Sequence, residues 1–341
     1  MTLSPPSKHS PPTLEAVAAE AGVSRSTVSR VVNGSSKVRA DVVETVQAAI
    51  ERLNYVPNRA ARSLANRQTM AIALVIPEDT GRFFGDPYFA AIVQGIARGL
   101  ESSDYVLNLQ LASQSNPSRK TVRYLTGGNV DGAFVVSHHA GDNFLADLGA
   151  RLPVVFGGRP LGRGTAVSYF VDVDNEAAAT MGTRYLIDRG RTRIATIAGP
   201  ADMPAGIDRT TGWIRALEQA GLGSERLVHG DFSQASGARG MRELLDRHPD
   251  LDAVFVASDL MATGAVSVLV EKGVRVPEDV AVVGFDDSPA ATTGVIPLTT
   301  VHQPSQAQGR RMAEMMLALL RGEPVEPECI MPTHMVVRDS A

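Results

Sequence analysis

Arg25 and Ser26 open a short amphipathic segment near the N-terminus, directly after Ser24, a residue type that often caps a helix. Valines recur along the segment at helical spacing and predict its inward face, at Val28, Val31 and Val32. The arginine and the serine are then expected on the outward face. An arginine fork can bond a guanine edge in the major groove of DNA, and a serine hydroxyl can bond a base or a phosphate. The segment therefore predicts a helix that reads nucleic acid.

A helix-turn-helix unit would position these side chains. Thr13 can cap a first helix, Gly22 permits a sharp turn, and Ser24 caps the second helix. In such a unit the N-terminal residues of the second helix reach base edges. A third helix over residues 42–53 would close the small core, and Pro57 is expected to end it because the residue before a proline disfavours helix.

Composition and charge agree with a small DNA-binding head on a larger body. The chain has 341 residues, of which 44% are hydrophobic and 21% charged, which is typical of a soluble globular protein of two or three domains. Nine of the 33 basic and five of the 37 acidic residues lie in residues 1–69, so this segment carries +4 and the rest −8. A basic head indicates a polyanionic partner. Residues 1–12 are polar and Pro/Ser-rich and predict a disordered arm, not a secretory signal.

The sequence of the head closely resembles the LacI/GalR family of transcriptional regulators. The resemblance rests on three runs, TLEAVA at 13–18, GVSRSTVSRVVNG at 22–34 and LNYVPNRAARSL at 53–64. It implies a DNA-binding domain at 13–57 and a hinge helix within 58–69 that folds only on DNA and whose Leu64 enters the minor groove. One departure is Arg39, which stands where the family usually has a small hydroxyl cap of the third helix. The DNA-contacting set implied by the resemblance is Thr13, Ser24, Arg25, Ser26, Thr27, Ser29, Arg30, Asn33, Lys37, Tyr55, Asn58, Ala61 and Leu64.

From Met70 onward, short continuous apolar runs alternate with helical patterns, which predicts parallel strands buried on both faces. The expected strands are 71–76, 106–111, 133–136, 154–156, 194–198, 227–228, 253–257 and 280–283. The run at 131–137 echoes the run at 252–258, which indicates two similar doubly wound halves or a coincidence of apolar composition. Two such halves would direct the carboxyl ends of their strands to a shared crevice.

The body also resembles the family's effector domain, which is similar to periplasmic sugar-binding proteins, through VDVDN at 171–175, GFDDS at 284–288 and LTTVHQP at 298–304. By this analogy one half comprises 70–172 and 303–331, and the other 173–302. The resemblance implies that Arg209 clamps an effector, Asp286 accepts from its hydroxyls and Phe232 stacks on its ring. The other expected pocket residues are Ser258 and Asp259 from the second half and Asp86, Tyr88, Phe89, Ser137 and His138 from the first.

The residues after the expected strand at 154–156 depart from the family pattern. Many relatives carry an acidic residue there, whereas this chain reads GGRP at 157–160. The loss of that side chain predicts a cleft enlarged for a di- or oligosaccharide.

Enzyme signatures are absent from the sequence. The chain has no P-loop, no G-x-G-x-x-G motif after a strand and no G-x-S-x-G elbow. His138 and His139 lack the helical i, i+4 spacing of a zinc pair, and Cys329 is the single cysteine. We therefore expect no catalytic residues, no metal and no cofactor beyond a small-molecule effector, and no apolar run is long enough to cross a membrane.

These observations together predict a cytoplasmic, homodimeric repressor of the LacI type. It would bind a near-palindromic operator in double-stranded DNA under the control of a small carbohydrate, most simply an inducing sugar. The predicted fold is an all-α helix-turn-helix head joined to an α/β body, 70–341, of two doubly wound parallel-sheet subdomains of periplasmic-binding-protein type. The alternative is a carbohydrate-binding receptor without a regulatory role on DNA.

Overall fold

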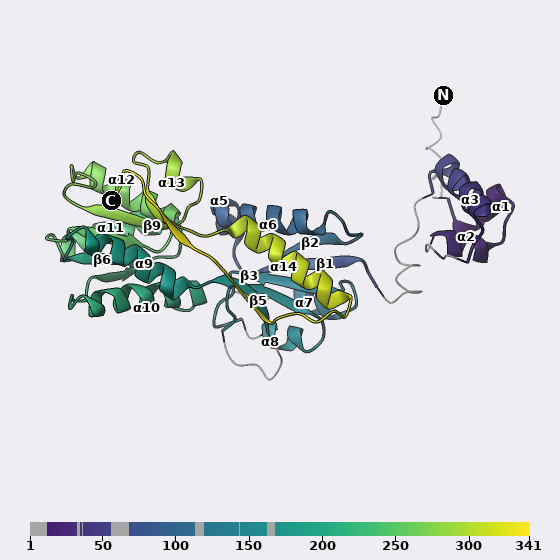
Figure 1. Cartoon of the computed structure of the whole chain (residues 1–341), viewed down its shortest axis with the longest axis horizontal. Coiled ribbons are helices and arrows are strands. Elements are labelled where there is room, and N and C mark those ends of the chain that lie inside the picture. The colour runs from purple at the N-terminus through teal and green to yellow at the C-terminus, as the bar shows by residue number, and fades with distance from the viewer. Residues whose placement is uncertain are drawn as a thin grey trace, which may run out of the picture. The chain divides into compact units, whose positions relative to one another are not determined.

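The computed structural model describes residues 12–32, 35, 37–55, 68–112, 119–142, 144–161 and 168–341. The chain divides into two compact units, residues 1–69 and 70–341 (Figure 1). Most of the predicted N-terminal arm and the predicted hinge helix, with Asn58, Ala61 and Leu64, lie outside the described residues, as does Asn33.

The head contains three short helices, α1 (Leu14–Ala21), α2 (Arg25–Val32) and α3 (Ala40–Leu53). Their apolar faces meet in one core, at whose centre Val17, Val28 and Val46 are fully buried. The sequence predicted the residues that begin and separate α1 and α2. Thr13 Oγ1 accepts from the backbone N–H of Ala16 at 3.3 Å, and Ser24 Oγ accepts from that of Thr27 at 3.1 Å.

The ends of the head helices differ from the expectation at one point. Gly22 adopts the left-handed conformation, with φ of 65°, and forms the expected turn. Helix α3, however, ends at Leu53 because Asn54 is left-handed, with φ of 52°, so the helix stops before Pro57 can act. At the other end of α3, Arg39 occupies the N-cap, and its side chain makes no capping hydrogen bond to the helix backbone, as its residue type suggests.

The body is built on two six-stranded sheets with matching strand orders, β11-β5-β4-β3-β1-β2 and β12-β10-β9-β8-β6-β7. All described neighbours are parallel except β10 and β12, which are antiparallel. The matching orders support two similar halves. The strands of the first sheet are β1 (Ala71–Ile76), β2 (Val106–Leu111), β3 (Gly132–Val136), β4 (Val154–Gly157), β5 (Tyr169–Val173) and β11 (Glu328–Met331). Those of the second are β6 (Ile194–Ala198), β7 (Leu227–His229), β8 (Ala253–Val256), β9 (Ala281–Asp286), β10 (Thr299–His302) and β12 (His334–Val336).

Helices cover both sheets and bury their apolar residues against them. The first half carries α5 (Thr80–Gly85), α6 (Pro87–Leu100), α7 (Arg119–Thr126), α8 (Phe144–Gly149) and α14 (Ser305–Leu320). The second carries α9 (Asn175–Asp188), α10 (Pro204–Gln219), α11 (Gln234–Arg247), α12 (Asp259–Glu271) and α13 (Ala290–Thr293). Helix α14 packs closely on α6, and a Cβ atom on Gly95 or Gly309 would clash with the backbone of the facing helix.

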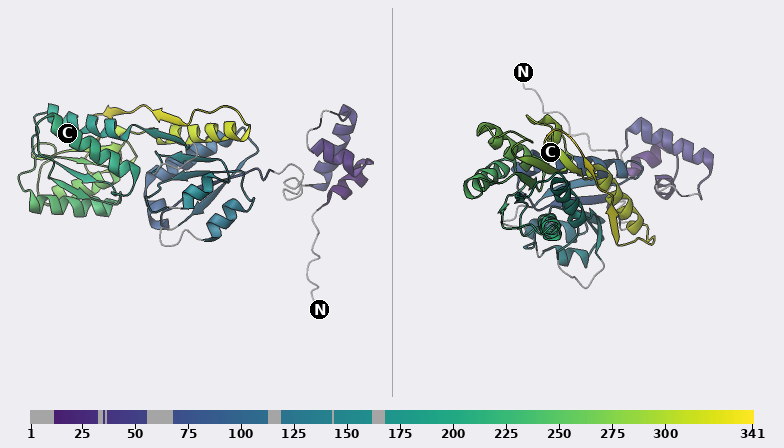
Figure 2. Two further views of the ribbon diagram at one scale, coloured as in Figure 1. Left: turned by 90° about the horizontal axis from the view of Figure 1, so that it is seen from below. Right: turned by 60° about the vertical axis from the view of Figure 1, so that its left-hand side comes forward.

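The chain passes between the halves three times, after β5, after β10 and after β11, and Figure 2 shows the last passage in yellow. The final residues therefore return to the second half. Ser340 is fully buried there, and its Oγ donates to the carbonyl of Val282 at 2.6 Å. The two halves are thus connected by three segments of the chain. Residues near the carboxyl ends of β1, β3, β4, β5, β6, β8 and β9 border the space between the halves.

Candidate functional site

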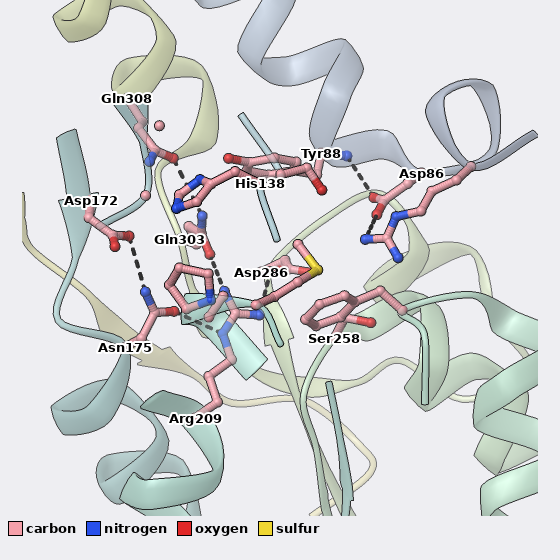
Figure 3. Close-up of a pocket in the computed structure, with 18 residues that line it drawn as sticks. Asp86, Tyr88, His138, Asp172, Asn175, Arg209, Ser258, Asp286, Gln303 and Gln308 are labelled. Atoms are coloured by element: carbon pink, nitrogen blue, oxygen red, sulfur yellow. Dashed lines mark hydrogen bonds and ion pairs between the residues drawn. The ribbon is translucent and has the colours of Figure 1, made fainter. Parts of the chain in front are cut away.

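A pocket of about 630 Å³, including solvent space, lies between the two halves of the body. Figure 3 shows Asp86, Tyr88 and His138 on one side and Arg209, Asp286 and Ser258 on the other. The structure brings eight of the predicted effector residues to this pocket, namely Asp86, Tyr88, Ser137, His138, Arg209, Phe232, Ser258 and Asp286.

Two predicted effector residues lie elsewhere. Phe89 is fully buried in the core of the first half, because it follows Tyr88 on α6 and the helix turns it toward the sheet. Asp259 is also fully buried and is occupied within the protein. Its Oδ1 accepts from Thr300 Oγ1 at 2.6 Å and its Oδ2 from the backbone N–H of Ser288 at 2.8 Å. Asp259 therefore ties β10 to the loop after β9, and burial raises its pKa to about 7.

Arg209, on α10, is the most highly bonded side chain of the pocket. Its Nε donates to Asn175 Oδ1 at 2.9 Å and its Nη2 to Gln303 Oε1 at 2.6 Å. Its Nη1 donates to the carbonyl of Ala257 at 2.7 Å and lies 3.4 Å from Asp286 Oδ1. The guanidinium also stacks at 3.5 Å from the ring centre of Phe285. Arg209 is thus fixed before any ligand binds.

The acidic residues around Arg209 are strongly affected by burial. Burial raises the pKa of Asp286 well above its usual range, although Arg209 acts in the opposite direction. Burial likewise raises the pKa values of Asp86 and Asp172. It lowers the pKa of Arg209, which Asp286 and Asp172 oppose, and a guanidinium remains charged in any case. The positive charge of this wall is therefore balanced within the protein.

His138 differs from Arg209 in its hydrogen bonding. The residue is 4% exposed, and neither ring nitrogen has a hydrogen-bond partner among the described residues. Its ring meets that of Phe156 edge-on, with centroids 5.4 Å apart. Burial lowers the pKa of His138 to about 4, so the imidazole is neutral and offers one donor and one acceptor. The side chain lines the pocket, and both ring nitrogens are buried.

Phe232 supplies an apolar face. It follows β7 in the left-handed conformation, with φ of 64°, and is 7% exposed. The guanidinium of Arg82, from α5 in the other half, lies 5.1 Å from the centre of the Phe232 ring. Such a ring can pack against the apolar face of a flat or cyclic ligand.

Five polar lining residues were not predicted, namely Arg82, Asp172, Asn175, Gln303 and Gln308. Asn175 donates to Asp172 Oδ1 at 3.0 Å, and Gln308 donates to the carbonyl of Val171 at 2.8 Å. Asp172 lies at the end of β5, and Asn175 and Gln303 lie where the chain passes between the halves, after β5 and after β10. The sequence signal for such residues is a polar residue directly after an apolar run. The runs at 171–175 and 298–304 indicate only a resemblance to the family's effector domain.

Gly157 and Gly158 line the pocket at the place where the sequence departs from the family pattern. A Cβ atom on Gly157 would come within 2.8 Å of Val136 Cγ1 and 3.0 Å of Met312 Sδ. Gly158 has φ of 103°, which favours glycine. Packing and backbone conformation therefore both keep this wall free of side chains.

The head presents the predicted DNA-reading residues at its surface. Arg25 and Ser26 are exposed at the start of α2, and Arg25 Nε lies 3.1 Å from Glu15 Oε1. Ser24 Oγ is 2.8 Å from both Ser26 Oγ and Thr27 Oγ1. Thr13, Arg30 and Lys37 are exposed as well, and Ser29 is half-buried.

Tyr55 differs from the other predicted DNA contacts. It is 7% exposed and belongs to the core of the head, since the chain turns back on α3 at Asn54. Its ring therefore stabilises the head.

Neither a metal site nor a membrane-spanning helix is found in the described part of the chain. No group of three or more histidine, cysteine and carboxylate side chains in these residues could hold a metal ion. No helix in these residues is long and apolar enough to span a bilayer.

Residues 13–58 match the family described as bacterial regulatory proteins, lacI family, and residues 183–341 match a periplasmic binding protein-like domain. The HTH-type transcriptional regulator CelR of Thermobifida fusca is 46% identical over 333 residues, which cover 96% of this chain and 98% of that protein. The chain belongs to the LacI family. The HTH-type transcriptional repressor PurR of Erwinia tasmaniensis is 34% identical, over 93% of each chain.

Solved structures of LacI-family members resemble this chain over nearly its whole length. A CelR–cellobiose complex has a TM-score of 0.76 and 43% identity, covering 97% of this chain and 100% of that one. A lac repressor dimer bound to operator and the anti-inducer ONPF has a TM-score of 0.86 and 28% identity, covering 97% and 99%. The chain is thus a DNA-binding transcriptional regulator of the LacI type, with the predicted head and two-part body.

Proposed function

We propose that this LacI-family protein is a homodimeric repressor that binds a near-palindromic operator and is released from it by a neutral di- or oligosaccharide. The observation that carries the ligand class is the pocket itself. It combines fixed polar groups around Arg209, an unpartnered neutral imidazole on His138 and the aromatic face of Phe232. A sugar ring needs this mixture, because its edges carry hydroxyls and its faces are apolar.

The charges in the pocket favour an uncharged ligand. Arg209 pairs with Asp286, and Arg82 lies 3.4 Å from Glu78 Oε1 and 3.8 Å from Asp86 Oδ2. Neither arginine is left without a carboxylate, so a phosphate or carboxylate on the ligand would have to displace one. Hydroxyl groups can instead donate to these carboxylates and accept from the guanidinium groups.

The size of the ligand is supported by the open wall at Gly157 and Gly158 and by a relative. CelR, 43% identical in its solved complex, is described there with cellobiose, a disaccharide. We propose a β-linked disaccharide of this kind as the first candidate. No catalytic role is proposed for the chain, and no metal or other cofactor.

A ligand can act on DNA binding only if the two halves hold it differently in two states. The halves touch on both sides of the pocket. Arg159, after β4, pairs with Asp208 on α10 at 2.8 Å, and His139, after β3, lies 3.0 Å from Asp202 Oδ2. A sugar that bonds both walls would favour this closed arrangement. The coupling is reciprocal, typically ~1–3 kcal/mol, so the inducing sugar binds less tightly to the DNA complex.

Calorimetry on the full-length protein tests the ligand assignment. Glucose, cellobiose, maltose and lactose would be titrated in turn, together with glucose 6-phosphate as the charged probe. We expect a disaccharide to bind most tightly and the phosphorylated sugar to bind least. A hexose that binds far better than every disaccharide, or a preference for the phosphate, would overturn the proposal.

A further inference from the structure

A second hollow of the body lies next to the enclosed pocket and shares part of its lining. This outer groove has a volume of about 1210 Å³, including open solvent. Arg82, Asp86 and Phe232 line both the pocket and the groove. The two spaces are therefore neighbours, and these three side chains form the boundary between them.

Arg82 is the one boundary residue that reaches from one half of the body to the other. It starts from α5 in the first half, and its Nη1 donates to the backbone carbonyl of Asp231 in the second half. Its guanidinium lies over the ring of the neighbouring Phe232. Glu78 and Asp86 flank it on its own side, and its side chain is only 16% exposed. Contacts from both halves thus hold Arg82 across the boundary.

The outer groove has the chemistry to receive further sugar units. Five carboxyl groups line it, from Glu78, Asp79, Asp86, Asp202 and Asp231. Carboxylates accept hydrogen bonds from sugar hydroxyls. Phe232 adds an aromatic surface to the groove. A saccharide longer than the enclosed pocket would have to pass the position of Arg82 to reach these groups.

We infer that Arg82 sets the length of the effector by closing the enclosed pocket toward the outer groove. This inference rests on the proposed saccharide ligand and adds which residue limits its size. Removal of the Arg82 side chain joins the two spaces, and a third sugar unit can then lie in the groove. The restriction comes from one side chain, so a single substitution is enough to relax it.

The test measures the dissociation constants of the full-length protein for the β-1,4-linked glucose di-, tri- and tetrasaccharides. For the unchanged protein, we expect the trisaccharide to bind about tenfold more weakly than the disaccharide, which corresponds to ~1.4 kcal/mol. In Arg82→Ala, we expect this ratio to fall to about threefold or less, with the disaccharide still bound.

Arg159→Ala is the matched control. Arg159 also pairs across the halves, with Asp208, but it lines neither the pocket nor the groove. Loss of this pair should weaken the binding of all lengths alike and leave the ratio unchanged. Binding of the disaccharide by both variants shows that they fold.

The outcomes separate the two proposals. A ratio that is the same in the unchanged protein and in Arg82→Ala overturns the role of Arg82 and leaves the saccharide assignment standing. A ratio that falls equally in Arg159→Ala shows that looser closure of the halves relaxes the length limit. That result also overturns the role of Arg82. If the unchanged protein binds none of these saccharides and none of the sugars named above, the proposed function fails as well.

Discussion

The DNA-reading surface of the head and the pocket of the body use polar side chains in opposite ways. Arg25 is exposed and pairs with Glu15, which is exposed too. Arg209 is 5% exposed and bonds Asn175, Gln303 and Asp286. The head therefore leaves its arginine available to an incoming partner, whereas the body fixes its arginine in advance.

This difference follows from what each site must bind. DNA is larger than the head and brings its own charges, so an exposed arginine can exchange a weak surface pair for a base or phosphate. A neutral ligand enclosed in a pocket brings only hydroxyls, so the pocket must already have balanced its own charges. Within the pocket, His138 is the group that resembles the head most closely, because its partners are left for the ligand to supply.

We expect the largest loss of function from removing the Arg209 side chain in the pocket. Arg209→Ala leaves Asp286 without its buried ion-pair partner and leaves Asn175 and Gln303 without their donor. Breaking a buried ion pair in this way typically costs ~3–5 kcal/mol of folding stability. We expect loss of effector binding and of the effector response, with operator affinity unchanged in the absence of effector. Calorimetry and operator titration measure the two properties.

Arg215→Ala serves as the control for Arg209→Ala. Arg215 stands on the same helix, but it is 55% exposed in its side chain and pairs only with Glu176 at the surface. It should bind effector normally. A normal response in Arg209→Ala would remove Arg209 from the pocket's function.

We expect His138 to make the stability of the protein depend on pH. Its pKa is lowered to about 4 in the folded protein, from an ordinary value of 6.5, by burial. The unfolded chain then binds more protons between pH 6.5 and 4, so the contribution of His138 to stability is lost as the pH falls through this window. The loss reaches up to about 3 kcal/mol. In His138→Phe, the free energy of unfolding should lose this part of its pH dependence.

The neighbouring His139 provides a control of opposite sign. Burial lowers its pKa, but hydrogen bonds to Glu78 and Asp202 outweigh burial and leave the pKa raised. The contribution of His139 to the free energy of unfolding is present below its pKa in the unfolded chain and is lost as the pH rises. Comparison of His138→Phe with the unchanged protein removes the effects of the buried aspartates. If His138→Phe and the unchanged protein have parallel curves from pH 4 to 6.5, His138 is not held neutral by burial.

Arg25→Ala tests the DNA-reading surface of the head. We expect a loss of ~1–3 kcal/mol in operator affinity and a relaxed preference at one base position of each half-site. Competition titrations with operator variants and with random DNA, at fixed salt, measure both effects. Arg52→Ala is the matched control, since Arg52 pairs with Glu20 at 3.0 Å on the same head and lies on α3. An equal loss on random DNA would make Arg25 a phosphate contact only.

The smallest expected effect concerns the start of α3. Arg39→Ser supplies the side-chain acceptor that this N-cap lacks, at the expense of an exposed pair with Asp41. We expect a gain of ~0.5–1 kcal/mol, measured as slower hydrogen exchange at the amides of Val42 and Val43. Unchanged exchange would show that the exposed pair already replaces the cap.

The sequence predicted the head better than the pocket, for a physical reason. The caps at Thr13 and Ser24 and the turn at Gly22 depend on residues within one or two helical turns. Tyr55 was placed on the DNA surface because its burial depends on the left-handed turn at Asn54, which the proline signal obscured.

In the body, the strands with continuous apolar runs were found, but β5, β10, β11 and β12 were not. The run in β11 alternates exposed and half-buried residues, and β12 is short, so neither has the pattern of a strand buried on both faces. Pocket residues were found where they follow a strand or carry a family likeness. Gln303 and Asn175 were missed because their role comes from Arg209, which is distant from both in sequence.

The central claim is that a saccharide in the body controls sequence-specific DNA binding by the head. The most direct measurement selects genomic fragments on the full-length protein at stated salt and then repeats the selection with cellobiose present. We expect that one near-palindromic sequence is enriched and that a di- or oligosaccharide releases it. Fragments retained without a common sequence, or an enriched site that no saccharide affects, would contradict it.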